Sequence, residues 1–80
     1  MKAIIHITLK AGVLDPQGKA IEHALSELGF TGLKNVRQGK RIEIALHESD
    51  KKKAEEKISA MCQKLLVNMV IENYEIEIKD

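Results

Sequence analysis

Apolar residues follow two different periods along this chain, and their alternation is the feature that most limits its fold. Residues 3–10 alternate apolar and polar side chains, which is the pattern of a strand with one buried face. The same period of two returns at residues 42–47 and 74–79. Between these segments, residues 21–28 and 54–65 carry apolar residues every three or four positions, as amphipathic helices do. The pattern predicts strand, helix, strand, helix and strand in that order.

The first helix has clear start and stop signals. Asp15 is a good N-cap, and Pro16 follows at the first helical position, where its missing N–H is not needed. Gly29 supplies the left-handed residue that commonly ends a helix. The expected buried stripe consists of Ile21, Ala24, Leu25 and Leu28.

The second helix is expected to begin after Ser49 or Asp50 and to run through residues 51–66. Its first turn carries three lysines, which we interpret as a solvated charged face. Its expected buried stripe consists of Ala54, Ile58, Met61, Cys62 and Leu65.

The segment between the first helix and the second strand has two possible interpretations. Gly39 and Lys40 could turn a tight hairpin, which would add a fourth strand. They could equally form a bulge in one long bent strand, because an isolated glycine in a strand pattern permits either. Both interpretations remain open at this point.

The element order β-α-β-(β)-α-β indicates one α+β domain over residues 1–80. Two right-handed crossovers on an antiparallel sheet would place both helices on one face of that sheet. The expected architecture is therefore a ferredoxin-like sandwich with two helices on one face.

Composition excludes several classes of partner. The 13 basic and 12 acidic residues leave a net charge of +1, which does not favour a nucleic-acid or membrane surface. Aromatic residues are limited to Phe30 and Tyr74, too few for a base-stacking module. No apolar run approaches the roughly 20 residues that cross a bilayer, and the N-terminus lacks a small-residue cleavage site. We therefore expect a soluble, cytoplasmic protein that contacts neither nucleic acid nor membrane.

The chain offers no recognisable catalytic or metal-binding set. Cys62 is the single cysteine and lies within a helical apolar stripe, which favours a buried structural thiol. His6, His23 and His47 match no metal-ligand spacing and are expected at surface positions. No phosphate-binding or dinucleotide-binding glycine motif occurs. Catalytic, cofactor-binding and metal-binding residues are therefore all expected to be absent.

A small basic group surrounds Gly39. Arg37, Lys40 and Arg41 could hold a phosphate or an acidic patch on a partner. They could equally form a charged tip that protects sheet edges from pairing. The residues alone do not choose between these functions.

Three functional classes remain open on this reasoning. The chain could be a subunit of a larger enzyme, a ligand-sensing regulatory domain, or a minimal enzyme of the acylphosphatase type. The last would use an asparagine and an arginine to hold a phosphate, and Asn35 and Arg37 are available. However, no glycine-rich anion loop precedes a helix at a suitable place.

Three segments in order and spacing resemble the PurS family, the small subunits of phosphoribosylformylglycinamidine synthase. They read LKAGVLDPQGKAIEHAL, VRQGKRIEI and MCQKLLVNMVIENYEIEI, and the likeness extends from Met1 to about Lys79. Met69 stands where the family commonly has proline. The resemblance implies a required but non-catalytic subunit of an ATP-dependent amidotransferase complex in purine biosynthesis. That complex converts formylglycinamide ribonucleotide to the amidine with glutamine as the nitrogen source.

The resemblance also implies the partners. A PurL synthetase subunit would bind ATP and magnesium, and a PurQ glutaminase subunit would release ammonia. This chain would bind no cofactor itself and would form a homodimer or a dimer of dimers. The expected subunit contacts lie in the turn before the first helix and around the basic group: Gly12, Asp15, Pro16, Gly18, Arg37, Gly39, Lys40 and Arg41.

Gly18 lies at an unusual place for a glycine, the first turn of the predicted helix. A glycine in the first helical turn costs up to about 1 kcal/mol relative to alanine. We therefore expect Gly18 to permit close approach by another chain. On that hypothesis, a bulky residue would weaken assembly and leave the isolated fold intact.

Overall fold

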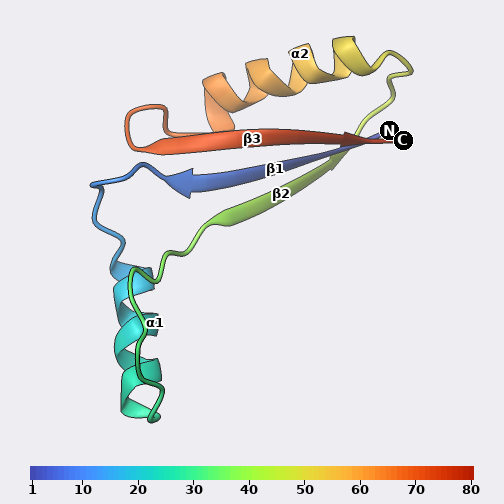
Figure 1. The fold of residues 1–80 in the computed structure, drawn as a ribbon. Coiled ribbons are helices and arrows are strands. Elements are labelled where there is room, and N and C mark those ends of the chain that lie inside the picture. Colours follow the sequence, from blue (N-terminus) through green and yellow to red (C-terminus); the bar gives the residue numbers. More distant parts are fainter.

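The first strand lies at the centre of the sheet. In the computed structural model, which describes residues 1–80, β1 (Lys2–Leu9) is flanked by β2 (Lys40–Ala45) and β3 (Glu72–Lys79). Both neighbours run antiparallel to β1, with Ile5 opposite Ile42 on one side and Ile76 on the other. Two helices, α1 (Pro16–Glu27) and α2 (Lys51–Met61), complete the order predicted from sequence (Figure 1). The α+β fold class is confirmed.

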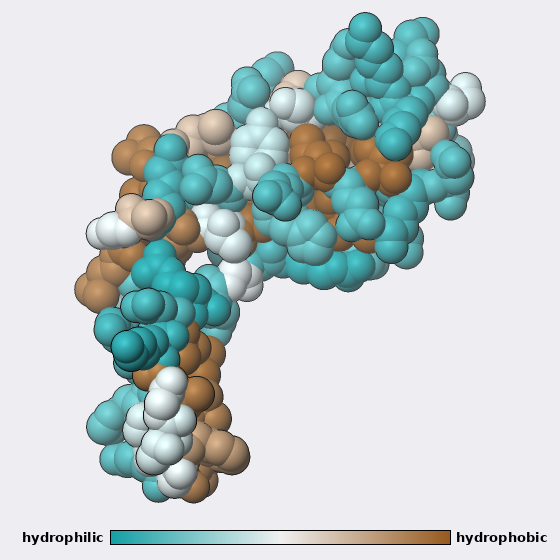
Figure 2. All heavy atoms as spheres, in the orientation of Figure 1, coloured by the Kyte–Doolittle hydropathy of each residue, from teal (hydrophilic) through white to brown (hydrophobic).

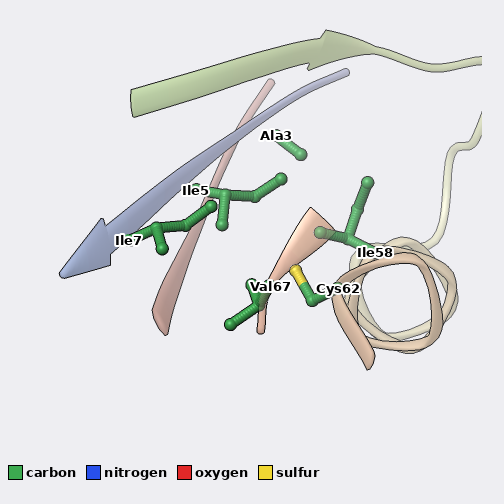
Figure 3. Packing of buried hydrophobic residues seen from close by; sticks show 6 residues of the cluster. All are labelled: Ala3, Ile5, Ile7, Ile58, Cys62 and Val67. Carbon is green, nitrogen blue, oxygen red and sulfur yellow. The ribbon is translucent and has the colours of Figure 1, made fainter. Parts of the chain in front are cut away.

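One face of this sheet forms the core with α2. Ala3, Ile5 and Ile7 of β1 point toward the helix, where Ile58 and Cys62 meet them (Figure 3). All five are at most 1% exposed. The apolar residues predicted from the alternation in β1 and from the helical spacing in α2 therefore face each other in one core.

The end of the second helix differs from the expected stripe. Asp50 caps α2 as predicted, because its carboxylate accepts hydrogen bonds from the Lys52 and Lys53 amides. After Met61 the chain widens into a π-helical turn, η1 (Cys62–Leu66). A π-helical turn contains more residues than an α-helical turn, so the side chains after Met61 point in other directions than a regular helix would give them.

Two members of the predicted stripe are wrong: Leu65 lies within the wide turn, whereas Met61 is the last residue of α2 before it. Met61 is 40% exposed and Leu65 is 84% exposed. Val67, whose amide donates to the Cys62 carbonyl across the wide turn, packs in the core instead, with Leu66 beside it. The regular helical period on which the prediction rested ends at Cys62.

The first helix does not lie on the sheet. Its caps are as predicted: Asp15 begins it, and Gly29 ends it with a φ of +97°. However, α1 projects away from the sheet at the end remote from the chain termini (Figure 1). Only α2 packs extensively on a strand, and that strand is β3. The expected sandwich with two helices on one face is therefore wrong in the position of α1.

Residues 28–39 form neither a hairpin nor a bent strand. They return along α1, and β2 begins only at Lys40 (Figure 1). Backbone amides that a sheet would use bind side chains of the helical segment instead: Val36 donates to Glu22 and Gln38 donates to Asp15. We call α1 together with residues 28–39 the arm.

The projecting arm makes the molecule long and its surface large. The Cα radius of gyration is 16.1 Å, whereas a globular chain of 80 residues has about 12 Å. The accessible surface is 5983 Å², whereas a folded monomer of 9.0 kDa exposes about 4,900 Å². A single copy thus leaves much more surface in water than a self-sufficient domain of its size.

Candidate assembly surface

A buried carboxylate joins the two halves of the arm at its base. Asp15 is only 4% exposed, and its two oxygens accept from different segments. The Gly18 amide donates to Oδ1 at 2.8 Å, and the Gln38 amide donates to Oδ2 at 2.7 Å. The hydrogen bond from Gln38, followed by that from Gly18, lowers the pKa of the Asp15 carboxyl below its usual value. Asp15 therefore caps α1 and also holds the returning chain against it.

Gly18 leaves room for the returning segment, which belongs to the same chain. A Cβ on Gly18 would lie 2.3 Å from the Val36 carbonyl oxygen. The hypothesis that Gly18 leaves room for a second chain is therefore wrong, because the space is filled within the same chain. A bulky residue at this position would disturb the isolated arm as well as any assembly.

Arg37 holds the returning segment of the arm to the turn that precedes α1. Its guanidinium donates to the Val13 carbonyl at 3.0 Å and to the Lys10 carbonyl at 3.2 Å. These two carbonyls belong to the turn that connects β1 to α1. Arg37 thus binds the start of the arm to its end, and we call Asp15, Gly18, Arg37 and Gln38 the arm base.

The three basic residues around Gly39 do not gather at one site. Arg37 is directed to the turn carbonyls, whereas Lys40 lies on the core side of β2 and pairs with Glu72 at 3.4 Å. Arg41 lies on the opposite face of the strand and pairs with Glu43, whose pKa it lowers. Neither the phosphate site nor the hairpin tip considered from sequence is formed.

The remaining predicted contact residues occupy turns and strand ends. Gly12 is exposed with a φ of +85°, and Pro16 occupies the first turn of α1. Gly39 lies against β1, where an added Cβ would come within 2.7 Å of the Ile7 carbonyl oxygen. Asn35 is the only non-glycine residue with a positive φ and lies in the returning segment.

Several residues of this region carried no sequence signal. Gln38 and Glu22 act as hydrogen-bond partners across the arm, and neither was predicted as a contact residue or as part of an apolar stripe. The Gln38 side chain also donates to Gln17 at 2.6 Å. Glu72 is buried at the start of β3, where it accepts from the Asn68 amide and faces Lys40. Its place on the core side of β3 was the one available clue, because it continues the alternation of Tyr74.

Exposed apolar side chains gather on the arm and near its base (Figure 2). On the arm, the stripe predicted to be buried is instead partly in water, with Ile21 39% and Leu28 74% exposed. On the sheet, the core side of β2 is only half-buried because α2 packs against β3. We call this second surface the β2 margin, and it comprises Ile42, Ile44 and Leu46.

The remaining candidate groups are dispersed. Cys62 is buried, and this burial raises the pKa of its thiol. His6 Nε2 lies 3.6 Å from Glu77 Oε1 on the open face of the sheet. On α1, His23 Nε2 lies 3.1 Å from Glu27 Oε1. No group of three or more histidine, cysteine or acidic side chains is positioned to hold a metal ion, and neither helix could cross a bilayer.

A family model described as PurS, phosphoribosylformylglycinamidine (FGAM) synthase, matches residues 2–80. The chain belongs to the PurS family. The PurS subunit of Methanocaldococcus jannaschii is 44% identical over 78 residues, covering 98% of this chain and 94% of that protein. The resemblance inferred from the three sequence segments is confirmed.

Solved structures of PurS proteins share the fold. Bacillus subtilis PurS has a TM-score of 0.86 at 39% identity and covers 99% of this chain and 98% of its own. A chain in the PurLQS structure from Thermotoga maritima also has a TM-score of 0.86, at 37% identity, with 95% and 93% covered. TM-scores this high over nearly the whole chain place the arm within the shared PurS fold.

Proposed function

We propose that this chain is a non-catalytic assembly subunit of phosphoribosylformylglycinamidine synthase in purine biosynthesis. It joins a PurL synthetase and a PurQ glutaminase for glutamine- and ATP-dependent amidation of formylglycinamide ribonucleotide. Membership of the PurS family over residues 2–80 carries this proposal. The PurLQS structure from Thermotoga maritima supports it, because a PurS-like chain of the same fold occurs there.

The use of polar groups in this chain agrees with an assembly role. The buried carboxylate of Asp15 binds two backbone amides of the arm, and the guanidinium of Arg37 binds two carbonyls of the turn before α1. Both groups thus determine the shape of a projecting element. In this proposal ATP and magnesium bind to the synthetase partner, and the site of action is the cytoplasm.

We also propose that the working form is a homodimer or a dimer of dimers. A single copy exposes about 1,100 Å² more surface than a compact monomer of its mass. Burying apolar surface between copies is a common way for so short a chain to gain stability. Light scattering at micromolar concentration should give twice or four times the mass of one chain, and a monomer would contradict the proposal.

Reconstitution tests the assembly function. Purified chain is titrated into the synthetase and glutaminase subunits of the same organism while glutamine-dependent formation of the amidine is followed. Activity should rise and saturate at a fixed stoichiometry, with none from the chain alone. Activity independent of the chain would overturn the proposal and lead to ligand screening for a sensing domain.

A matched pair of charge reversals locates the contact surface. Arg41→Glu changes a predicted contact residue on the open face of the sheet, whereas Lys52→Glu changes an exposed residue of α2. We expect the first to raise the concentration needed for half-maximal activity about tenfold, a change worth about 1.4 kcal/mol. The second should leave it unchanged. Equal effects of the two variants would remove Arg41 from the contact surface.

A further inference from the structure

We propose that this chain binds a zwitterionic α-amino acid with an amide side chain, in a trough on the open face of the sheet. The open face is the one opposite the core, and the trough lies where β1 ends and β3 begins. The inference goes beyond the proposed function, which assigns no small-molecule ligand to this subunit.

The trough is large enough for a small molecule. It has a volume of about 570 Å³, within the roughly 300–1,000 Å³ typical of ligand sites in proteins. In the β1–β3 register, His6 lies opposite Glu75. Thr8 lies opposite Asn73, and these two cross-strand pairs form the floor of the trough. Met69 lines it from the loop that precedes β3.

The loop that carries Met69 is held in place by a buried carboxylate. Glu72 is only 8% exposed, and its Oε1 accepts from the Asn68 amide at 2.8 Å. Its Oε2 lies 3.4 Å from the Lys40 ammonium. The Asn68 side chain in turn accepts from the Val70 amide at 3.1 Å. The backbone on both sides of Met69 is therefore fixed before a ligand binds, which reduces the entropy lost on binding.

Several polar side chains of the trough have no partner within the chain. They are the side chains of Lys10, Thr8, Asn73 and Glu75, which take part in none of its hydrogen bonds or ion pairs. Elsewhere on the open face, charged side chains of the three strands pair with one another. The unpaired groups of the trough are thus available to a ligand.

The charges in the trough indicate the class of that ligand. The Lys10 amide donates to the Ile71 carbonyl at 2.8 Å, which places Lys10 opposite Ile71. Glu75 lies four residues further along β3, roughly 13 Å away at about 3.3 Å per residue. Both side chains extend into the space between, so their charged ends suit the carboxylate and the ammonium of one amino acid. A phosphate would be repelled by Glu75 and a divalent cation by Lys10.

The neutral groups of the trough indicate the side chain of the ligand. The Asn73 amide both donates and accepts, so it can pair with an amide of the ligand through two hydrogen bonds. The Thr8 hydroxyl can add a third. Met69 offers an apolar contact to methylene groups. Glutamine, the nitrogen source in the proposed function, has all of these groups.

Titration of the ¹⁵N-labelled chain with glutamine tests the site. We expect saturable chemical-shift changes in the amides of residues 6–10 and 72–75 and none in α2. Glutamate should bind about tenfold more weakly, because its second carboxylate would be repelled by Glu75. Propionamide, which has the amide but neither charge, should cause no saturable change. Changes that do not saturate, changes confined to other surfaces, or equal binding of glutamate would overturn the proposal.

Matched removals of charge give an independent readout. Lys10→Gln and Glu75→Gln each remove a charge that the ligand would bind, and circular dichroism should show an unchanged fold. Lys79→Gln is the control, because it removes a charge from the same face of the sheet outside the trough. We expect the dissociation constant for glutamine to rise about tenfold in each of the first two variants and to stay unchanged in the third. Equal constants for all three variants would place the ligand elsewhere and refute the site.

These outcomes are independent of the proposed function, because the titration uses this chain alone. Failure of glutamine to bind would leave reconstituted amidine synthesis dependent on the chain. Amidine synthesis that does not depend on the chain would leave the titration unchanged.

Discussion

At the scale of single residues, the arm depends on a glycine and a carboxylate that each serve two segments. Gly18 is buried beneath the Val36 carbonyl, and Asp15 accepts from both its own helix and the returning chain. Sequence reasoning identified both residues from helix-capping rules and helix propensities. It did not identify their second roles, because a cap has the same local signature whether or not another segment uses its free oxygen.

Gly18→Val should destabilise the arm. The added Cβ would meet the Val36 carbonyl oxygen at 2.3 Å, and overpacking of this kind typically costs about 1–3 kcal/mol. Urea unfolding measures the loss, with Ala20→Val at an exposed position of the same helix as the control. Valine forms helices less readily than alanine but more readily than glycine, so without the close approach Gly18→Val should cost less than Ala20→Val. A smaller loss for Gly18→Val than for Ala20→Val would show that the close approach at Gly18 carries no energetic weight.

Asp15→Asn should destabilise the protein in a pH-dependent way. The new amide can accept from Gly18 with its oxygen, but its NH₂ group would then face the Gln38 amide, which is also a donor. Asp50→Asn is the matched control, because only one oxygen of Asp50 is used. Midpoints of thermal unfolding at pH 7 should fall further for Asp15→Asn than for Asp50→Asn.

The sign of the pH dependence follows from the lowered pKa of Asp15. A carboxylate with a folded-state pKa below its unfolded value of about 3.9 stabilises the fold above that pH. This contribution is lost as the pH falls through the folded-state value. The difference between wild type and Asp15→Asn should therefore be largest at neutral pH and narrow below about pH 4. A difference independent of pH would contradict ionisation of Asp15 as its source.

At the scale of elements, periodicity predicted which segments are helices and strands and which face of each is apolar. It could not predict what covers that face. The stripe of α1 has the same spacing whether it packs on its own sheet or on another surface, so the sequence favoured the compact sandwich. The wide turn η1 was equally invisible, because Leu65 continues a regular helical pattern in the sequence.

The arm should unfold separately from the sheet when it has no partner. Leu28→Glu would place a charge in the exposed apolar stripe of α1. In this variant, the amides of α1 should exchange hydrogen faster than those of β1, because few packed contacts hold the helix to the core. In the wild type, where the proposed homodimer would cover α1, its amides should be protected at least tenfold more strongly than in the variant. Native-state hydrogen exchange measures both, and equal protection of α1 in the two proteins would argue that no partner covers it.

At the scale of the whole molecule, one copy has a core on one side of the sheet and excess surface elsewhere. Unfolding of a dimer that dissociates depends on concentration by mass action. For two chains of 80 residues, the midpoint should rise by about 4 °C for each tenfold increase in protein concentration. Scanning calorimetry over two decades of concentration tests this, and a constant midpoint would indicate that folding requires one copy only.

The two ends of the chain meet at one corner of the sheet, far from the arm (Figure 1). Lys2 is paired with Lys79, and the Met1 carbonyl accepts from the Leu46 amide. A short flexible peptide could therefore join the ends into a ring, and the ring could be cut at Gly32, which is exposed in the segment that returns along α1. The polypeptide would then run in a new order through the same sheet, with its free ends carried at the outermost point of the molecule.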